Sequence, residues 1–272
     1  MGKIISFINQ KGGVGKTTTC VNMSAFLAAY GKKVLIVDLD PQGNATTGVG
    51  IDKTQELNTF YDIILDECTI KDAIMPTNIK NLSILPSNVD LAGSEMLLVQ
   101  RENREKVLKN ILSTIKNDYD YIAIDCPPSL GLLTVNALTS TDTIIIPIQC
   151  EFYALEGLSQ LMNTVKLVKE YLNSGIEIEG VVLTMKDNRS NLVTQVAEEI
   201  KKFFGRKVYN TVIPRNVRLA EAPSHGVPIL LYDSRSTGAI AYQNLVIEFL
   251  RKNKDSGKMI NIKEIVKESK NG

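Results

Sequence analysis

The sequence has few of the residues that build metal sites. Its 272 residues include four cysteines, none in a CxxC pair, and a single histidine, His225. A structural zinc site needs four Cys or His ligands at short spacings, so this supply argues against one. Cys20 and Cys126 stand beside apolar or helical runs, where a free cysteine behaves as a small hydrophobic residue. We therefore expect buried thiols in a reducing cytoplasm.

The sequence also lacks an excess of either charge and any long apolar run. It has 31 Lys and Arg against 30 Asp and Glu, which excludes a uniformly basic nucleic-acid coat protein and a highly charged disordered chain. No stretch approaches the roughly 18 apolar residues of a membrane span. The start, MGKIISFINQKGG, lacks a signal core and a cleavage site. These absences, with 44% hydrophobic residues, predict a soluble, cytoplasmic globular protein.

Short runs rich in Ile and Val alternate with stretches of helical spacing. This order is typical of a doubly wound α/β fold, in which a mostly parallel sheet carries helices on both faces. The predicted strands are Lys3 to Asn9, Lys33 to Asp40 and runs near Leu82, Ile122, Ile145, Val182 and Val212. The predicted helices, after one that ends at Gly31, are Ala92 to Lys116, Leu155 to Leu172, Leu192 to Phe204 and Ala239 to Lys252. Without any linker or repeat, we expect one domain over residues 1–253 and a Lys-rich, solvated, partly helical tail over 254–272.

The run NQKGGVGKTT, residues 9–18, directly follows the first strand and opens a helix. It contains three glycines: Gly12, Gly13 and Gly15. Glycines let the backbone curl so that N–H groups point at phosphate oxygens, and the helix N-terminus adds positive charge. In such a phosphate loop (P-loop), Lys16 reaches the β- and γ-phosphates and the Thr17 hydroxyl binds Mg²⁺.

A second lysine, Lys11, stands in the same loop, and Gln10 occupies the place of the first glycine in the general pattern GxxxxGK[ST]. Two lysines in one small anion site repel each other unless a polyphosphate neutralises both. Lys11 therefore either points into solvent or serves another set of phosphates, and only a facing phosphate would give it a counter-charge. The residues alone leave both alternatives open.

Three aspartates stand at the carboxyl ends of predicted strands, where open α/β sheets bind ligands. Asp38 and Asp40 belong to VDLDPQG, and Asp125 ends the strand of YIAIDCPPS. A carboxylate there can hold a metal-bound water or orient an attacking water, although an aspartate in this place often only caps a turn. The order of P-loop, DLDPQ and YIAID favours a metal role for Asp125.

Together these segments resemble a known family. KGGVGKTT is similar to the deviant Walker A motif of the ATPases that partition chromosomes and plasmids (ParA, Soj) and of the cell-division regulator MinD. The likeness covers residues 1–250, includes DPQGNATTG, DCPPS, TMKDNRSN and IPRNVRLAEAPSHG, and is closest to Soj because no helix-turn-helix domain fits before the loop. It implies ATP and Mg²⁺ as cofactors and a homodimer that encloses ATP, in which Lys11 reaches the partner's nucleotide.

The resemblance also implies roles for individual residues. Lys11, Lys16 and Asp40 are the expected catalytic residues; Asp40 positions the attacking water, and Asp38 is structural or supporting. Thr17 and Asp125 are expected to hold Mg²⁺, Asp125 through water. The expected nucleotide contacts are Lys11, Gly12, Gly13, Val14, Gly15, Lys16, Thr17, Thr18, Pro214 and Asn216.

Charge is unevenly distributed along the chain. Residues 186–218 hold eight basic and three acidic side chains, a net charge of +5, and residues 251–272 hold seven and three, a net charge of +4. Such segments are usually solvated faces. In Soj relatives, however, arginines at the positions of Arg189 and Arg218 belong to a strip that binds DNA once two subunits close on ATP. The resemblance thus implies nonspecific double-stranded DNA, on the nucleoid, as a partner.

The resemblance implies a slow ATPase that is stimulated by a ParB-like centromere-binding protein and acts in chromosome or plasmid partitioning. Two alternatives stay open. A MinD-like ATPase would bind membrane through the stripe from Met259 to Val266, which is short and lacks aromatic residues. A ParA-like ATPase of the same fold would position a cargo other than a chromosome, and the residues suit it almost equally well.

Overall fold

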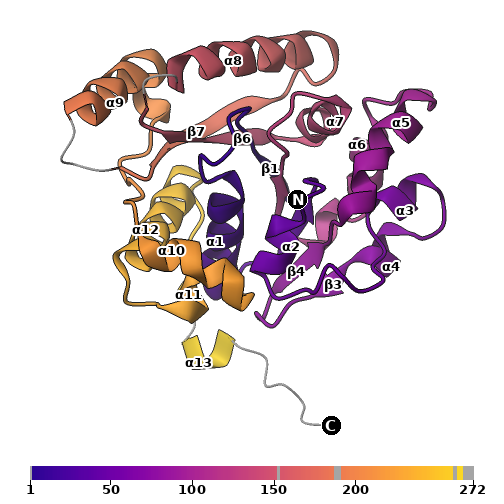
Figure 1. Ribbon diagram of the computed structural model, residues 1–272, viewed down its shortest axis with the longest axis horizontal. Coiled ribbons are helices and arrows are strands. Elements are labelled where there is room, and N and C mark those ends of the chain that lie inside the picture. Colours follow the sequence, from indigo (N-terminus) through magenta and orange to yellow (C-terminus); the bar gives the residue numbers. More distant parts are fainter. Residues whose placement is uncertain (1, 152–153, 187–190, 260–261, 266–272) are drawn as a thin grey trace.

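The computed structural model describes residues 2–151, 154–186, 191–259 and 262–265, and these residues build one seven-stranded sheet (Figure 1). The strands are β1 (Lys3–Phe7), β2 (Val34–Asp38), β3 (Met75–Pro76), β4 (Leu82–Leu85), β5 (Tyr121–Asp125), β6 (Thr143–Gln149) and β7 (Glu177–Thr184). Their order is β3-β4-β2-β5-β1-β6-β7, and only the short β3, which the sequence did not predict, pairs antiparallel within this part of the chain. The predicted α/β fold with a mostly parallel sheet is confirmed.

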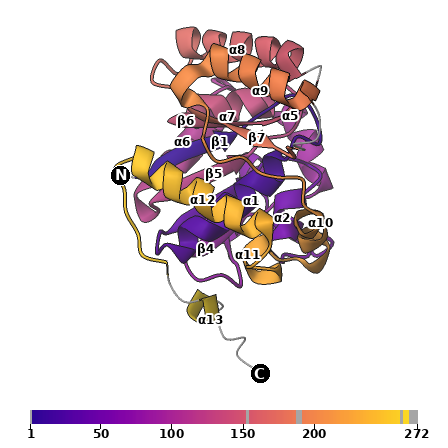
Figure 2. The same cartoon turned by 90° about the vertical axis from the view of Figure 1, so that its left-hand side faces the viewer.

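Helices cover both faces of the sheet (Figures 1 and 2). One face carries α1 (Lys16–Ala29), α2 (Asn44–Gly48), α10 (Val217–Glu221), α11 (Ile229–Tyr232) and α12 (Thr237–Lys252). The other carries α3 (Phe60–Ile64), α4 (Ile70–Ala73), α5 (Ser94–Val99), α6 (Val107–Ser113), α7 (Leu132–Ser140), α8 (Ala154–Tyr171) and α9 (Asn191–Phe204). Along β2, Val34 and Ile36 pack with the first group, whereas Leu35 and Val37 pack with the second. Burial on both faces explains the unbroken apolar runs of the sequence.

The long helix predicted over Ala92 to Lys116 is wrong. The chain instead forms a 3₁₀ turn (Val89–Gly93), α5 and α6, with residues 100–106 between the two helices. That stretch, QRENREK, offers no apolar side chain to the core, and Asn103 has a φ of 52°, in the left-handed region. Since a helix of this length depends on burying one face, it ends where the apolar pattern ends.

The strand predicted near Val212 is also wrong. Residues 208–214 run beside the edge strand β7 without forming a continuous ladder. An isolated bridge joins Val208 to Val181, the Ile213 N–H donates to the Leu183 carbonyl at 2.9 Å, and a second bridge joins Pro214 to Lys186, just beyond the end of β7. Between these bridges the chain turns toward α12, where the N–H groups of Asn210 and Thr211 donate to the Glu248 carboxylate at 2.9 and 3.0 Å. A charged hydrogen-bond acceptor thus takes the place of a neighbouring strand.

The described part of the tail is mostly exposed, as expected, but a few of its residues contact the body. Asp255 accepts hydrogen bonds from Lys32 Nζ at 2.6 Å and from the Tyr121 hydroxyl at 2.7 Å. In α13 (Ile262–Ile265), the Ile265 side chain is 1% exposed, and its carbonyl accepts from the Lys80 N–H at 2.7 Å. The division of the chain at residue 253 stays a prediction. Within the described ranges, none of the helices combines the length and apolar character needed to cross a bilayer.

Candidate nucleotide-binding site

The carboxyl ends of β1, β2 and β5 bring the P-loop and the three aspartates to one edge of the sheet. β5 lies between β1 and β2, so that Asp125 is in register with Phe7 on one side and with Asp38 on the other. Figure 2 shows α2 and α10, which flank this edge, at the opposite end of the molecule from the N-terminus. The sequence motifs therefore converge where α/β sheets of this kind bind ligands.

The P-loop backbone needs its glycines at two positions. Gly13 and Gly15 have φ values of 74° and 86°, in the left-handed region that residues with a Cβ rarely adopt. Gly15 is the N-cap of α1, which begins at Lys16. The loop therefore ends directly on a helix N-terminus, as the anion-binding prediction requires.

Two side chains that the sequence did not single out brace this loop. Asn9 accepts from the Lys11 N–H at 3.0 Å and donates to the Pro147 carbonyl at 2.8 Å. The Thr184 hydroxyl, at the end of β7, donates to the carbonyl of Val14 at 2.8 Å. The loop is thereby tied to β6 and β7. A local motif does not identify such partners, because they come from distant strands.

Lys16 is 6% exposed, and its ammonium donates to the Lys11 carbonyl at 3.2 Å. Burial lowers the pKa of Lys16, and the charges of Asp125 and Asp40 oppose this effect. A buried ammonium with one carbonyl partner gains strongly from an anion, because the interaction is poorly screened by water. The position of Lys16 thus suits a phosphate ligand.

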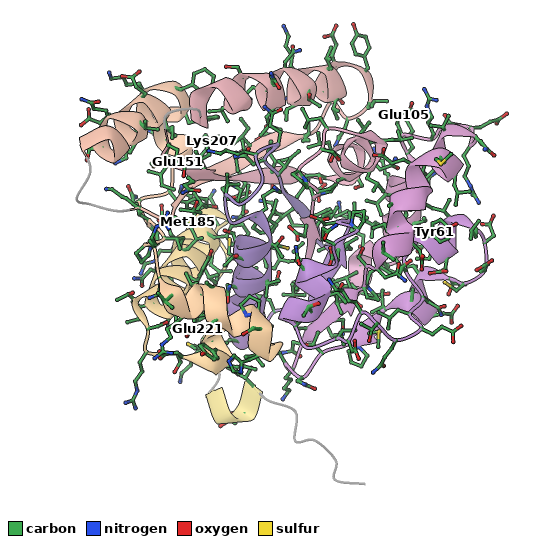
Figure 3. All side chains as sticks on the ribbon, viewed as in Figure 1. Tyr61, Glu105, Glu151, Met185, Lys207 and Glu221 are labelled. Atoms are coloured by element: carbon green, nitrogen blue, oxygen red, sulfur yellow. The ribbon has the colours of Figure 1, made fainter. Side chains whose placement is uncertain are left out.

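Lys11 has a counter-charge within its own chain, so the expectation that only a facing phosphate would supply one is wrong. Its Nζ lies 2.5 Å from Glu151 Oε2, and the two side chains are 36% and 46% exposed. In Figure 3, Glu151 and Met185 lie on the same side of the molecule, away from Tyr61 and Glu105. Ion pairs this exposed contribute only about 0–1 kcal/mol, so a polyphosphate could displace Glu151 at little cost.

Asp38 is fully buried and satisfied by its neighbours. Its Oδ2 accepts from the Thr46 N–H at 2.9 Å and from the Thr46 hydroxyl at 2.8 Å, and its Oδ1 accepts from the Asp40 N–H at 3.2 Å. Burial raises the pKa of Asp38 to about 6, although the bonds from Thr46 act in the opposite direction. Asp40 differs, because only one of its side-chain oxygens bonds to the residues that the structure describes: its Oδ1 accepts from the Gln42 N–H at 2.9 Å.

Asp125 is fully buried, and neither of its carboxylate oxygens makes a well-formed hydrogen bond to the described residues. Burial, followed by the charge of Asp38, raises the pKa of Asp125 well above its usual range. The nearby Thr17 hydroxyl acts in the opposite direction without reaching hydrogen-bond geometry. Two unpartnered buried oxygens beside a hydroxyl fit a hydrated Mg²⁺ ion, which would supply the missing charge and donors.

The protein alone supplies few metal ligands at this edge. Among the residues that the structure describes, no group of three or more His, Cys, Asp or Glu side chains could hold a metal ion. Mg²⁺ is often bound by one or two protein oxygens, with water and substrate phosphates completing its octahedron. Thr17 and Asp125 fit that pattern better than a preformed protein cage.

A cavity of about 370 Å³ opens beside the two threonines of the P-loop. It is lined by Thr17 and Thr18 from α1, by Asn44 and Thr47 from α2, and by Lys53, among others. Polar hydroxyls and amides therefore face open space next to the start of α1. This placement is compatible with the predicted ligand roles of both threonines.

The structure brings Pro214 beside the end of β7 but leaves the Asn216 amide occupied. Lys186 and Pro214 form a parallel bridge. Asn216 caps α10: its Oδ1 accepts from the Leu219 N–H at 3.3 Å, and its Nδ2 donates to the Thr237 hydroxyl at 2.8 Å. A nucleotide contact by Asn216 would therefore involve its backbone or replace one of these bonds.

The two arginines of the predicted DNA strip differ in what the structure describes. Arg189 lies outside the described residues. Arg218, on α10, is exposed and forms ion pairs with Glu221 at 2.9 Å and with Asp233 at 3.7 Å. Such surface pairs are weak and screened by salt, so Arg218 can exchange them for phosphate oxygens.

Known proteins share this sequence and fold. Residues 2–178 match the AAA domain family. The sporulation initiation inhibitor protein Soj of Bacillus subtilis is 60% identical over 248 residues, which cover 91% of this chain and 98% of that protein. The chromosome partitioning protein ParA of Caulobacter vibrioides is 49% identical over 255 residues, covering 93% and 96%.

A solved structure shares the fold over almost the whole chain. The cobyrinic acid a,c-diamide synthase of Mycobacterium smegmatis, with bound ATP analog and magnesium, superposes with a TM-score of 0.81 at 32% identity, covering 96% of this chain and 100% of that one. This chain belongs to the ParA/Soj family of chromosome-partitioning ATPases.

Proposed function

We propose that this ATPase binds Mg-ATP at the P-loop, closes into a homodimer around two nucleotides, and in that state binds DNA without sequence preference. The observation that carries the nucleotide site is the buried Asp125 carboxylate beside Thr17, which has no well-formed hydrogen bond within the described ranges, on the edge where Lys16 has one carbonyl partner among those residues. A buried carboxylate without hydrogen-bond donors and a buried ammonium are costly without a ligand, even though the two charges attract each other. Mg-ATP brings a cation for the one and phosphates for the other.

Each residue has a distinct task in this proposal. The bound Mg²⁺ would neutralise charge on the β- and γ-phosphate oxygens. Lys16 holds the phosphates of its own subunit, Asp125 orients the metal-bound water, and Asp40 orients the attacking water. Lys11 leaves Glu151 and reaches the nucleotide of the partner subunit, which makes dimerisation depend on ATP.

Support for a DNA-binding role comes from the charge of the chain. Residues 186–218 carry a net charge of +5, and their exposed basic side chains include Lys201, Lys202, Arg206 and Lys207. These four lie on α9 and on the turn that follows it, where Figure 3 labels Lys207. Two copies of such a segment on one duplex double the number of phosphate contacts. Release would then follow hydrolysis, which we propose a ParB-like protein stimulates.

Binding to a membrane is disfavoured by the packing of the tail. Met259 is partly buried against the core, and the Ile265 side chain is buried. These are two of the apolar residues of the stripe that a MinD-like protein would insert. Insertion would first have to expose core-packed side chains, at a cost of roughly 1.5–3 kcal/mol for each one that is fully buried. Which cargo the ATPase moves is a further part of the proposal, and we expect a chromosome or plasmid.

Two lysine variants test the dimer. Lys16→Ala should lose ATP binding, whereas Lys11→Ala should keep nucleotide and stay monomeric because its contribution is to the partner's phosphates. Light scattering during gel filtration, with and without Mg-ATP, measures the mass of each variant. Lys33→Ala, which removes an exposed lysine at the amino end of β2, is the matched control and should dimerise. A dimer that forms without nucleotide and is unaffected by Lys11→Ala would contradict the proposal.

Charge reversal tests the DNA surface. Arg189→Glu should abolish duplex binding while the ATP dimer persists, because the role proposed for Arg189 is contact with DNA phosphates and not dimerisation. If roughly six phosphates are neutralised per dimer, the affinity of the unaltered protein should fall about 10³-fold between 50 and 200 mM salt, on any duplex sequence. Fluorescence anisotropy measures both effects. Lys109→Glu, the same charge change on α6, should leave binding intact, and a strong sequence preference would count against the model.

A further inference from the structure

A chain of buried hydrogen bonds links the ends of β4 and β2. The Ser87 N–H donates to Thr46 Oγ1 at 2.9 Å, and Thr46 Oγ1 donates to Asp38 Oδ2 at 2.8 Å. All three residues have no exposed surface. The Thr46 hydroxyl accepts one bond and donates the other, so it joins the end of one strand to the carboxylate of the next. Solvent cannot easily replace either bond at this depth.

The same chain holds the backbone on both sides of Asp40. The Asp40 N–H donates to Asp38 Oδ1 at 3.2 Å, and the Ser87 hydroxyl donates to the Asp40 carbonyl at 2.7 Å. That carbonyl also accepts from the Gly43 N–H at 2.8 Å, which closes a turn. With its preceding and following peptide units fixed, Asp40 has little freedom in the direction of its Cα–Cβ bond. The Asp40 carboxylate is therefore aimed by residues that are themselves buried.

We propose that Thr46 is a positioning residue for ATP hydrolysis, because its hydroxyl keeps Asp38 and Ser87 in the arrangement that fixes Asp40. This inference rests on the water-positioning role proposed for Asp40. Among the described residues, the N–H and hydroxyl of Thr46 bond to Asp38 and Ser87, its carbonyl accepts from the N–H groups of Val49 and Ile51, and none of these bonds goes to the P-loop. Thr46 should therefore affect the rate of the chemical step and leave nucleotide binding nearly unchanged.

Removing only the hydroxyl tests this role. Thr46→Val keeps the shape of the side chain but leaves the Ser87 N–H without its acceptor. We expect kcat for ATP hydrolysis to fall about 10- to 100-fold, since small displacements of a catalytic group have effects of this size, with KM for Mg-ATP within about twofold of its original value. Thr46→Ser keeps the hydroxyl and should recover most of the lost rate.

A buried threonine outside the site provides a matched control. The Thr139 side chain is as buried as that of Thr46, and its hydroxyl donates to the Val135 carbonyl at 2.7 Å, inside α7. Thr139→Val should hydrolyse ATP at the rate of the unaltered protein. Thermal melting with and without Mg-ADP confirms that each variant is folded and binds nucleotide. If Thr46→Val does not fold, Ser87→Ala is measured instead, because it removes only the bond to the Asp40 carbonyl. We expect the same result for this variant: a lower kcat with a nearly unchanged KM for Mg-ATP.

The outcomes distinguish a failure of the positioning role of Thr46 from a failure of the water-positioning role proposed for Asp40. An unaltered kcat in Thr46→Val, or in Ser87→Ala where Thr46→Val does not fold, would overturn the positioning role, as would equal losses in Thr46→Val and Thr46→Ser. Asp40→Ala is measured in the same series. If Asp40→Ala hydrolyses ATP normally, the role of Asp40 itself fails; if Asp40→Ala is slow while Thr46→Val is normal, only the positioning inference fails.

Discussion

Asp40→Ala should produce a dimer that binds ATP, closes and then fails to open. The substitution removes the group that orients the attacking water but none of the predicted phosphate contacts, and the loss of such a group lowers rates by on the order of 10² or more. Asp40 suits this task because only one of its carboxylate oxygens is held by the described residues, through the Gln42 N–H. Single-turnover kinetics measure the expected loss of hydrolysis, and the molecular mass in Mg-ATP shows whether the dimer persists.

The neighbouring aspartate supplies the comparison for this experiment. Asp38 is fully buried and bonds to Thr46 and to the Asp40 backbone, so Asp38→Ala should lower the melting temperature as well as the rate. Asp40→Ala should lower the rate alone. If Asp40→Ala turned over ATP normally while Asp38→Ala did not, the two roles would have to be exchanged.

Asp125→Asn should stabilise the nucleotide-free protein while abolishing its response to magnesium. The Asp125 carboxylate is buried without well-formed hydrogen bonds to the part of the chain that the structure describes, and burial and the charge of Asp38 raise its pKa well above the usual range. A carboxyl whose pKa is higher in the folded than in the unfolded protein binds more protons when folded. The free energy of unfolding therefore falls as pH rises from the ordinary pKa of Asp toward the folded value.

A comparison with Asp125→Asn isolates the contribution of Asp125 to the pH dependence of stability. Burial raises the pKa of Asp38 to about 6 and raises the pKa of Asp125 well above its usual range, and only the Asp38 contribution is left in the variant. Without Mg²⁺ the melting temperature of the unaltered protein should fall more steeply with rising pH than that of Asp125→Asn, which should be roughly 5 °C higher at neutral pH. Mg-ATP should raise the melting temperature of the unaltered protein only. If the melting temperature of Asp125→Asn fell more steeply with rising pH than that of the unaltered protein, the carboxylate would be stabilising and the prediction would fail.

The sequence predicted those parts of the site whose chemistry is local. The P-loop and the three aspartates each follow a strand within a few residues, and parallel strands bring such ends together without further information. The supporting residues were not predictable in this way. Glu151 and Thr184 meet the P-loop through β6 and β7, and only the packed sheet shows the contacts.

The local sequence also does not predict which way a short helix faces or where a long helix is interrupted. Nothing in NATTG indicates that Thr46 faces the strand ends while Thr47 bonds within its own helix, because the rotation of α2 is set by packing on Asp38. The predicted helix over residues 92–116 failed because a polar stretch interrupts the apolar pattern. The strand near Val212 failed because Glu248, far along the chain, captures its N–H groups.

The most direct test of the proposed switch is the affinity of the protein for an arbitrary duplex in Mg-ATP and in Mg-ADP, with anionic vesicles as the competing surface. The Asp40→Ala variant keeps ATP intact during the measurement. If ATP controls DNA binding through dimerisation, the duplex is bound in ATP, released in ADP and never bound by Lys11→Ala, while the vesicles capture nothing. Equal DNA affinity in the two nucleotides, or ATP-dependent capture by vesicles in place of DNA, would contradict it.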